Sequence, residues 1–284
     1  MTYKPSAEND LLWSPERLAG SLTHGTSQGS GHGVLKVLDV RLGEAFAMGH
    51  IDGAIHFSVY GVNTYDSDPA PLRSFAHMWA FLLSQRGITP EDEVVVCGNV
   101  SGMSAARAFW FLEYLGYTRV HLLDGGFQRW VEEGRSVTRD AVTPTPKPCR
   151  YELIPSRVAS HVDVLAAIED PDVVILDTRS RAEWLGQDAR ATRNGTIPGA
   201  IHQDWNAHLS EAGCFESPDR LASLFSALGC TPDKEVIAFC NTGYRSAHAY
   251  LALRLLGYPR VRNYVGSWQE WGNREGCPVV VPAP

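Results

Sequence analysis

The residues best suited to chemistry form one short loop, Cys240 to Arg245, which reads CNTGYR. Four apolar residues, Val236 to Phe239, precede it and predict a short buried strand. The loop is too polar and too rich in turn residues to continue that strand, and a helical pattern of apolar residues follows from Ser246 to Leu256. The backbone N–H groups of such a loop and of the helix start point towards one place. The pattern therefore predicts an anion-binding site with a cysteine at its centre.

The same surroundings should make Cys240 reactive. A free cysteine thiol has a pKa of about 8.5, and lowering that pKa by about two, which takes roughly 2.7 kcal/mol, makes the thiolate dominant at neutral pH. The loop amides, the helix dipole and the cation of Arg245 all favour the thiolate. The alternative is a buried cysteine that only packs, which is the commonest role of this residue type. Gly243 and Arg245 are poor packing residues, so we expect a nucleophilic thiolate.

The loop and three further segments resemble the rhodanese superfamily of sulfurtransferases. CNTGYRS is similar to its active-site loop, and its flanking motifs resemble LDTRSRAEW (Leu176 to Trp184), GTIPGAIH (Gly195 to His202) and NYVGSWQEWG (Asn263 to Gly272), in the family's order. The related tyrosine and dual-specificity phosphatases place five residues between the cysteine and the arginine, whereas this chain places four. The shorter loop favours a sulfur-bearing substrate over a phosphate.

The resemblance implies a thiosulfate sulfurtransferase that works by double displacement. Cys240 would take the outer sulfur of thiosulfate as a persulfide and pass it to cyanide or to a thiol, including a thiol on an acceptor protein. Arg245 would bind the sulfonate of the donor, and no metal or organic cofactor would take part. The remaining loop residues would line the substrate site: Asn241, Thr242, Gly243 and Tyr244.

Three other functions stay open at this point. A 3-mercaptopyruvate sulfurtransferase would use the same cysteine, but relatives of that kind tend to have an arginine in place of Glu183 and a loop close to CGSGVT. A persulfide carrier or interaction module would load sulfur but turn over poorly with small acceptors. A phosphatase or arsenate reductase would need a larger anion pocket and is the weakest of the three. Val265, where many relatives have an acidic residue, has no functional explanation.

Charged and aromatic residues near the loop are expected to support it. Asp177 ends a predicted strand, and Arg179 follows two residues later. A carboxylate in that place can fix a neighbouring loop and its arginine through charge-assisted hydrogen bonds. The resemblance places Trp268 near the pocket, where it would form a wall. His56 and His202 occupy matched positions in glycine-rich turns, so we interpret both as structural.

Length and composition fit an ordinary soluble globular protein with two domains, each with its own core, since the 284 residues are 44% hydrophobic and 20% charged. The formal net charge of -7 argues against nucleic-acid binding. The first ten residues carry no apolar stretch, and no window approaches the ~20 apolar residues of a membrane helix. The six cysteines form no close pairs and read as reduced thiols. We expect a cytoplasmic protein with no membrane partner and no metal-ligand spacing.

The chain repeats itself once. VLKVLDVRLGEAF matches VVILDTRSRAEW, GHIDGAIH matches GTIPGAIH, and EVVVCG matches EVIAFC. Further on, the segment from Ala106 to Trp130 matches the segment from His248 to Trp271. We predict two rhodanese-like domains, residues 1–140 and 156–284, joined by a proline-rich linker at 141–155.

Each half alternates predicted strands with predicted helices. Such alternation indicates the α/β class, with a mainly parallel sheet and helices on both of its faces. Ligands of such sheets bind at the C-terminal ends of the strands, where the Cys240 loop falls. The expected strands lie around Asp39, Val94, Val120, Val173, Val236 and Val261, and the expected helices span 75–85, 105–115, 221–228 and 245–256.

The first copy lacks the active-site residues. Gly98 takes the position of Cys240, and the loop GNVSGMS is one residue longer and has no arginine. Cys97 falls opposite Phe239 and is interpreted as a packing residue at a strand end. In tandem sulfurtransferases the N-terminal domain is commonly silent and the active site lies between the domains. The resemblance implies the same here, with residues 1–140 as the catalytically silent domain.

Overall fold

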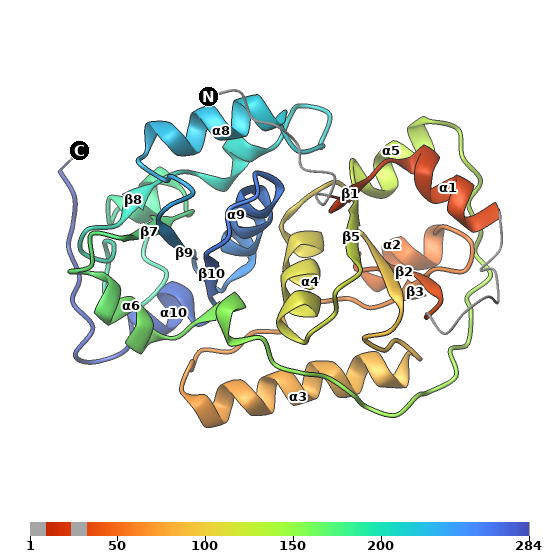
Figure 1. Cartoon of the computed structure of the whole chain (residues 1–284), viewed down its shortest axis with the longest axis horizontal. Coiled ribbons are helices and arrows are strands. Elements are labelled where there is room, and N and C mark those ends of the chain that lie inside the picture. The colour runs from red at the N-terminus through yellow and green to blue at the C-terminus, as the bar shows by residue number, and fades with distance from the viewer. Residues whose placement is uncertain (1–9, 24–32, 284) are drawn as a thin grey trace.

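A computed structural model of the chain describes residues 10–23 and 33–283. Residues 1–9, where the sequence predicts no signal peptide, lie outside this range. Two five-stranded sheets follow one another along the chain, with helices packed around each (Figure 1). All the neighbouring strands of both sheets are parallel. The predicted α/β class with two tandem units is confirmed.

The two sheets have the same strand order. The first runs β1 (Leu12–Trp13), β5 (Val120–Leu123), β4 (Glu93–Cys97), β2 (Leu35–Asp39) and β3 (Ile55–His56). The second runs β6 (Val158–Ala159), β10 (Val261–Tyr264), β9 (Glu235–Phe239), β7 (Val173–Asp177) and β8 (Ile201–His202). The register also agrees, because Asp39 pairs with Cys97 in the first sheet and Asp177 pairs with Phe239 in the second. The repeat in the sequence is thus a repeat in the structure.

The helices follow the same plan in both halves. The first half contains α1 (Pro15–Thr23), α2 (Gly43–Met48), α3 (Pro69–Gln85), α4 (Met103–Tyr114) and α5 (Gly126–Glu132). The second contains α6 (His161–Ala167), α7 (Arg181–Trp184), α8 (Pro218–Ala227), α9 (Tyr244–Leu255) and α10 (Ser267–Trp271), and two 3₁₀ helices, η1 (Pro155–Arg157) and η2 (Trp205–His208).

The helix α3 begins six residues earlier than the sequence pattern predicts. Its first residue is Pro69, and the preceding Asp68 has an extended backbone. Proline suits the first helical position because its fixed φ matches the helix and its missing N–H would have no partner there. The short helices α2 and α7 were not predicted, because six and four residues are too few to show a helical period.

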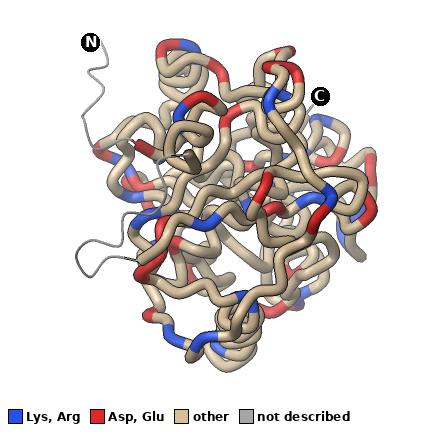
Figure 2. The backbone as a smooth tube through the Cα atoms, turned by 90° about the vertical axis from the view of Figure 1, so that its right-hand side faces the viewer, with Lys and Arg blue, Asp and Glu red and all other residues tan. Residues whose placement is uncertain are grey.

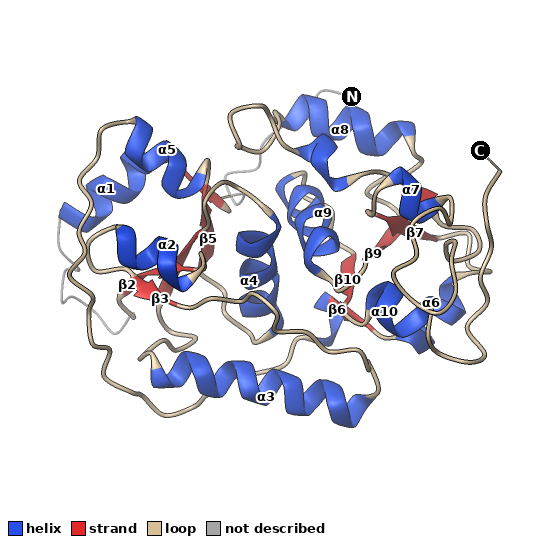
Figure 3. Cartoon of the chain, turned by 180° about the vertical axis from the view of Figure 1, so that it is seen from behind, coloured by secondary structure: helices blue, strands red, loops and turns tan. Residues whose placement is uncertain are grey.

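The helices α4 and α9 lie side by side between the two sheets, as Figures 1 and 3 show from opposite sides. Every residue from Ala105 to Leu112 and from Ser246 to Leu253 is buried. A single cluster of buried apolar side chains includes residues of both helices and of both sheets. A helix buried on all sides belongs to a protein interior and not to a loose interdomain contact. One core therefore spans the two halves, and each half also has a smaller buried cluster of its own.

A segment of the first half crosses to the second. Residues Val59–Asp68, called the crossing segment below, lead from β3 towards α3. The N–H of Ser67 donates to the Glu270 carboxylate at 2.9 Å, and the Asp68 carboxylate accepts from Arg274 at 3.0 Å. Glu270 and Arg274 lie 203 and 206 positions further along the chain than their partners Ser67 and Asp68. The segment thus ties the two halves together beside the loop of Cys240.

Between α5 and η1 the described chain forms neither helix nor strand. Lys147 donates its backbone N–H to the Ser84 carbonyl at 2.9 Å, so this stretch lies along the end of α3. The positions of the domain limits, 1–140, 141–155 and 156–284, stay a prediction.

Basic and acidic positions are interspersed over the chain in the view of Figure 2. Among residues 10–23 and 33–283, no helix combines the length and the apolar character needed to cross a membrane.

Candidate active site

The Cys240 loop lies where the central strand of the second sheet ends. The strand β9 stops at Phe239, and α9 begins at Tyr244. Gly243 stands at the helix N-cap with a φ of 84°, in the left-handed region that favours glycine. The start of α10 holds the loop from one side, because the N–H groups of Trp268 and Gln269 donate to the carbonyls of Cys240 and Asn241 at 2.9 and 3.0 Å.

The thiol of Cys240 is buried, with 1% of the residue exposed. Its Sγ accepts the N–H of Gly243 at 3.1 Å and lies 3.5 Å from the hydroxyl oxygen of Ser246. Burial alone would raise the pKa of this thiol, but the charge of Arg245 and the hydrogen bonds from Ser246 and Thr242 outweigh it and lower the pKa. The loop thus favours the thiolate form.

The other buried or part-buried thiols behave in the opposite way. Burial raises the pKa of Cys97, Cys214, Cys230 and Cys277. Cys97 ends β4 and is fully buried, as expected for a packing residue. Among these five thiols, the surroundings lower the pKa of Cys240 alone.

Arg245 is held by a carboxylate that sequence reasoning did not place near it. Its two terminal nitrogens donate to the two oxygens of Glu183, at 2.5 and 2.8 Å. Burial would raise the pKa of Glu183, but the bonds to Arg245 and to Ser180 lower it to about 2. Ser180 and Glu183 form a capping box at the start of α7. The spacing Ser-x-x-Glu signals such a box in the sequence, whereas the contact with Arg245 depends on the fold.

Asp177 and Arg179 form a buried ion pair behind the loop. The guanidinium donates to both carboxylate oxygens, at 2.9 and 2.6 Å, and to the carbonyl of Gly195 at 2.7 Å. The ring of Trp268 lies over the guanidinium at 4.3 Å, and its indole N–H donates to the Arg193 carbonyl. The hydroxyl of Thr178 donates to the Phe239 carbonyl at 2.9 Å.

The first half repeats this support. Arg41 binds Asp39 at 2.6 Å and lies 3.6 Å from the centre of the Phe127 ring. His56 and His202 each place Nε2 against a carbonyl, that of Arg41 at 3.0 Å and that of Arg179 at 2.8 Å. The same arrangement thus occurs in the copy that has no nucleophile.

Both halves of the chain line the cavity at Cys240, which has a volume of about 310 Å³. The crossing segment and the start of α4 form one wall, and the loop forms the other. The lining residues are Tyr60, Gly61, Asn63, Met103, Ser104, Cys240, Asn241, Thr242, Tyr244 and Arg245. The sequence gives no signal for Tyr60 or Asn63, which reach the cavity only because the two halves share an interface.

Tyr244 directs its hydroxyl away from the thiol. The hydroxyl donates to the carbonyl of Val59, and it lies 3.3 Å from the carbonyl of Val62. The loop is therefore fastened to the crossing segment by its own side chain.

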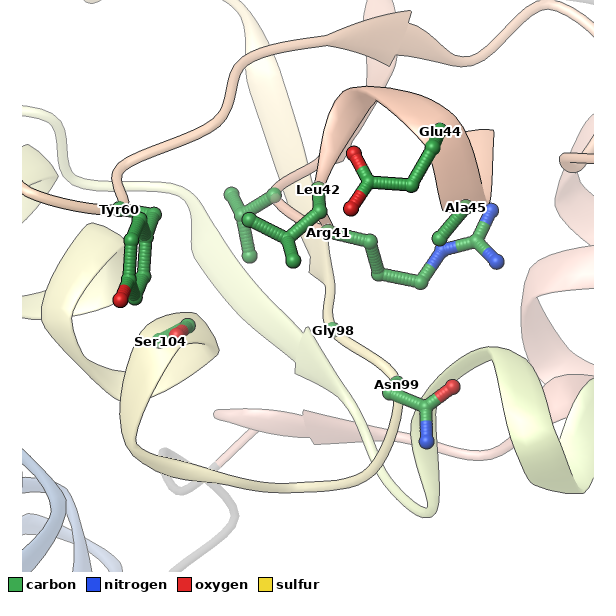
Figure 4. Close-up of a pocket in the computed structure, with 9 residues that line it drawn as sticks. Arg41, Leu42, Glu44, Ala45, Tyr60, Gly98, Asn99 and Ser104 are labelled. Atoms are coloured by element: carbon green, nitrogen blue, oxygen red, sulfur yellow. The ribbon is translucent and has the colours of Figure 1, made fainter. Parts of the chain in front are cut away.

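A second cavity of about 330 Å³ lies at the silent loop of the first half. Figure 4 shows Gly98 with Asn99, Leu42 and Glu44 in the lining of this cavity, and in the sequence repeat Gly98 takes the position of Cys240. Arg41, a cation in its lining, forms an ion pair with Asp39. The two cavities share Tyr60 and Ser104 in their linings, so they adjoin. The second cavity thus offers space beside the reactive thiol, and no thiol lines it.

Within the described ranges, no cluster of histidine, cysteine and carboxylate side chains has the arrangement of a metal site.

Comparison with known proteins adds to this geometry. The rhodanese-like domain family matches residues 24–133 and 160–274. The chain is 35% identical over 246 residues to the thiosulfate sulfurtransferase of Azotobacter vinelandii, covering 86% of this chain and 90% of that protein. It is 39% identical over 217 residues to the sulfur carrier protein TtuD of Thermus thermophilus, covering 71% of this chain and 75% of that protein.

Among solved structures, the anaerobic ergothioneine biosynthesis enzyme of Chlorobium limicola superposes with a TM-score of 0.85 at 22% identity. The match covers 98% of this chain and 72% of that one. At this identity the likeness concerns the fold.

Proposed function

Since the chain belongs to the rhodanese-like domain family, we propose that it is a thiosulfate sulfurtransferase in which Cys240 carries the sulfur as a persulfide. The observation that carries this assignment is the thiol itself: buried, shifted towards the thiolate, and 3.1 Å from a loop N–H at the wall of a cavity. The five other cysteines lie outside that cavity wall.

In the first half-reaction the Cys240 thiolate attacks the outer sulfur of thiosulfate. The bond between the two sulfurs of thiosulfate breaks, and sulfite leaves with the electron pair. A Cys240 persulfide anion remains, and the N–H of Gly243 stabilises charge on its sulfur. No proton is gained or lost in this step, which suits a buried site.

In the second half-reaction the terminal sulfur passes to an acceptor. Cyanide attacks that sulfur, the sulfur–sulfur bond of the persulfide breaks, and thiocyanate leaves while the Cys240 thiolate returns. A thiolate acceptor reacts in the same way and leaves as a persulfide. Tyr60 and Met103 line the cavity and are exposed to solvent, so this side of the cavity is accessible to a thiol on an acceptor protein.

Arg245 would hold the sulfonate of thiosulfate. The two hydrogen bonds from Arg245 to Glu183 use one N–H of each terminal nitrogen. A guanidinium has five N–H groups in all, so donors remain for the substrate. Glu183 fixes the orientation of this guanidinium. Asn241 and Thr242 would line the same substrate site.

A sulfur-carrier function is the second candidate, because a relative that matches 71% of this chain is named a sulfur carrier protein. Such a function would use the same persulfide with a protein acceptor. A 3-mercaptopyruvate donor would place its carboxylate near Arg245 as thiosulfate would place its sulfonate, so the choice between the two donors rests on kinetics. We also propose a cytoplasmic location, which fits the six free cysteines.

Steady-state kinetics with thiosulfate and with 3-mercaptopyruvate, each with cyanide as acceptor, test the assignment. We expect turnover with thiosulfate to exceed turnover with 3-mercaptopyruvate, and no turnover of an aryl phosphate. Intact mass after incubation with thiosulfate should rise by one sulfur in the wild type and in Cys97→Ser, and should not rise in Cys240→Ser. A mass gain that persists in Cys240→Ser contradicts the assignment. Sulfur loading without turnover on cyanide would favour the carrier function.

A further inference from the structure

A cation of the silent domain reaches the active-site loop. Arg107 lies on α4, is fully buried, and donates from Nη1 to the carbonyl of Gly243 at 3.0 Å. The two residues are 136 positions apart in the chain. A Cβ on Gly243 would lie 2.2 Å from this nitrogen, so the guanidinium and the loop backbone are in direct contact. Arg107 belongs to the first half of the chain, which has no nucleophile, yet it contacts the backbone of the loop that carries Cys240.

The carbonyl that Arg107 binds belongs to the peptide between Gly243 and Tyr244. It also accepts from the side-chain amide of Asn263 at 3.1 Å, and the oxygen of that amide accepts from the Ser246 hydroxyl at 2.7 Å. Because C=O and N–H point in opposite directions in a trans peptide, two donors on the carbonyl fix the direction of the Tyr244 N–H at the start of α9. The loop geometry around the thiol therefore depends on Arg107.

The charge of Arg107 faces no carboxylate among the described residues. Its Nε and Nη2 have no hydrogen-bond partner, and its guanidinium lies over the ring of Tyr244 at 5.0 Å and near the ring of Trp110 at 5.1 Å. Burial lowers the pKa of Arg107 to about 10, while Tyr244 and Cys240 oppose this effect. The side chain therefore stays a cation at neutral pH, and Cys240 is one of the two ionisable groups whose charge acts on it.

The other cation at the thiol differs in this respect. Arg245 also faces Cys240, but Glu183 binds it with both oxygens. Asp177 adds a second negative charge on that side of the loop, and Arg179 neutralises it. Of the two cations around the sulfur, Arg107 is the one whose charge is not already opposed.

The repeat supplies a natural comparison. His248 occupies the position on α9 that Arg107 occupies on α4, and its Nε2 lies 2.9 Å from the carbonyl of Ser101 in the silent loop. Gly102, the N-cap residue of α4, corresponds to Gly243, the N-cap residue of α9, and Ser101 directly precedes Gly102. Each half therefore braces the loop of the other half with one buried side chain. Burial lowers the pKa of His248 to about 4, so the side chain at the Ser101 carbonyl is neutral at pH 7. Arg107, the side chain at the Gly243 carbonyl, is a cation at that pH.

We infer that Arg107 is a positioning residue that the silent domain supplies to the active site: it orients the Gly243–Tyr244 peptide and stabilises the anionic sulfur of Cys240. The inference rests on the persulfide function proposed above. It also assigns a task to the first half beyond that of forming a wall, since Arg107 acts through the loop and its own charge.

The test is the pH dependence of Cys240 alkylation by iodoacetamide, followed by mass spectrometry of the Cys240 peptide in the full chain. Arg107→Met should raise the pH midpoint by roughly one unit, as expected for the loss of a nearby charge, and should lower kcat more than it raises KM. Arg107→Gln keeps an N–H donor without the charge and should also raise the midpoint. Arg107→Lys keeps the charge and should restore the midpoint in part.

The matched control is His248→Met, which removes the brace on the silent loop. It should lose stability without changing the midpoint. An unchanged midpoint in folded Arg107→Gln, or an equal shift in His248→Met, overturns the inference. If Arg107→Met does not fold, the comparison of the glutamine and lysine variants decides. Failure of the wild type to load sulfur from thiosulfate would instead refute the proposed function, whatever the alkylation midpoints.

Discussion

Glu183→Gln isolates the carboxylate that opposes the charge of Arg245. The glutamine has nearly the same shape, but it carries no charge and cannot accept both bonds of the guanidinium fork. In the wild type these bonds measure 2.5 and 2.8 Å, and the Glu183 side chain is 3% exposed. The substitution should therefore change two measurable quantities in opposite directions: the stability of the fold falls, and the acidity of the Cys240 thiol rises.

The effect on stability follows from the pKa of Glu183. The gap between the ordinary value of 4.5 and about 2 in the folded chain, at about 1.36 kcal/mol per pH unit, corresponds to a loss of about 3 kcal/mol at neutral pH. The folded pKa is depressed, so this stabilisation is complete above the unfolded pKa and disappears as the pH falls through the folded one. The difference in free energy of unfolding between wild type and variant should shrink between about pH 5 and about pH 2.

The effect on the thiol has the opposite sign. Arg245 is the largest influence that lowers the pKa of Cys240 against its burial. Without the Glu183 charge, the full field of the guanidinium acts on the thiolate, so the alkylation midpoint of Cys240 should move to lower pH. The sulfonate of thiosulfate should also bind more tightly, with a lower KM.

The assay is urea denaturation at several values between about pH 7 and about pH 3.5, together with iodoacetamide labelling. Asp163→Asn is the matched control. Asp163 lies on α6, also belongs to a capping box, and also pairs with an arginine, Arg262 of β10. This variant should lose a little stability and leave the labelling unchanged. A labelling midpoint that rises in Glu183→Gln, or a stability loss independent of pH, refutes the reasoning.

Three further outcomes are expected. Arg245→Lys should keep part of the activity with a higher KM for thiosulfate, because a point charge cannot reproduce the guanidinium fork, and wild-type kinetics would contradict this. Gly243→Ala should cost about 1–3 kcal/mol from its positive φ and more from its contact with the guanidinium of α4, measured by urea denaturation; Gly229→Ala, with a φ of 75° and nothing within 4 Å, should show the φ cost alone. Deleting residues 1–140 should lower solubility and sulfur transfer together, and a soluble, fully active fragment would contradict the shared site.

The sequence was sufficient for those features that depend on neighbouring residues. The cysteine at the end of a buried strand, the glycine before a helix and the repeat that sets Gly98 opposite Cys240 can all be recognised without a structure, because each rests on local spacing. The parallel sheet followed from the alternation of strands and helices, and the structure confirms it.

Contacts between distant segments could not be found in this way. Glu183 and Arg245 are 62 residues apart, and Arg107 and Gly243 are 136 apart. No periodicity links such pairs, and charge or size alone does not choose a partner among the 57 charged Lys, Arg, Asp and Glu residues of the chain. Tyr244 shows the same limit, since the sequence gives no signal that its hydroxyl contacts the carbonyls of the crossing segment.

The contacts of Arg107 and of the crossing segment also set an order of events during synthesis. A ribosome releases the first half of the chain before the second, and the domains of a growing chain generally fold in that order. The surface that supplies Arg107 and receives Tyr244 can therefore be in place before β9 and α9 emerge. The Cys240 thiol gains its full set of neighbours only when α9 packs on α4. In the nascent protein, the surroundings that lower the pKa of this thiol are therefore completed late, after most of the chain has been made.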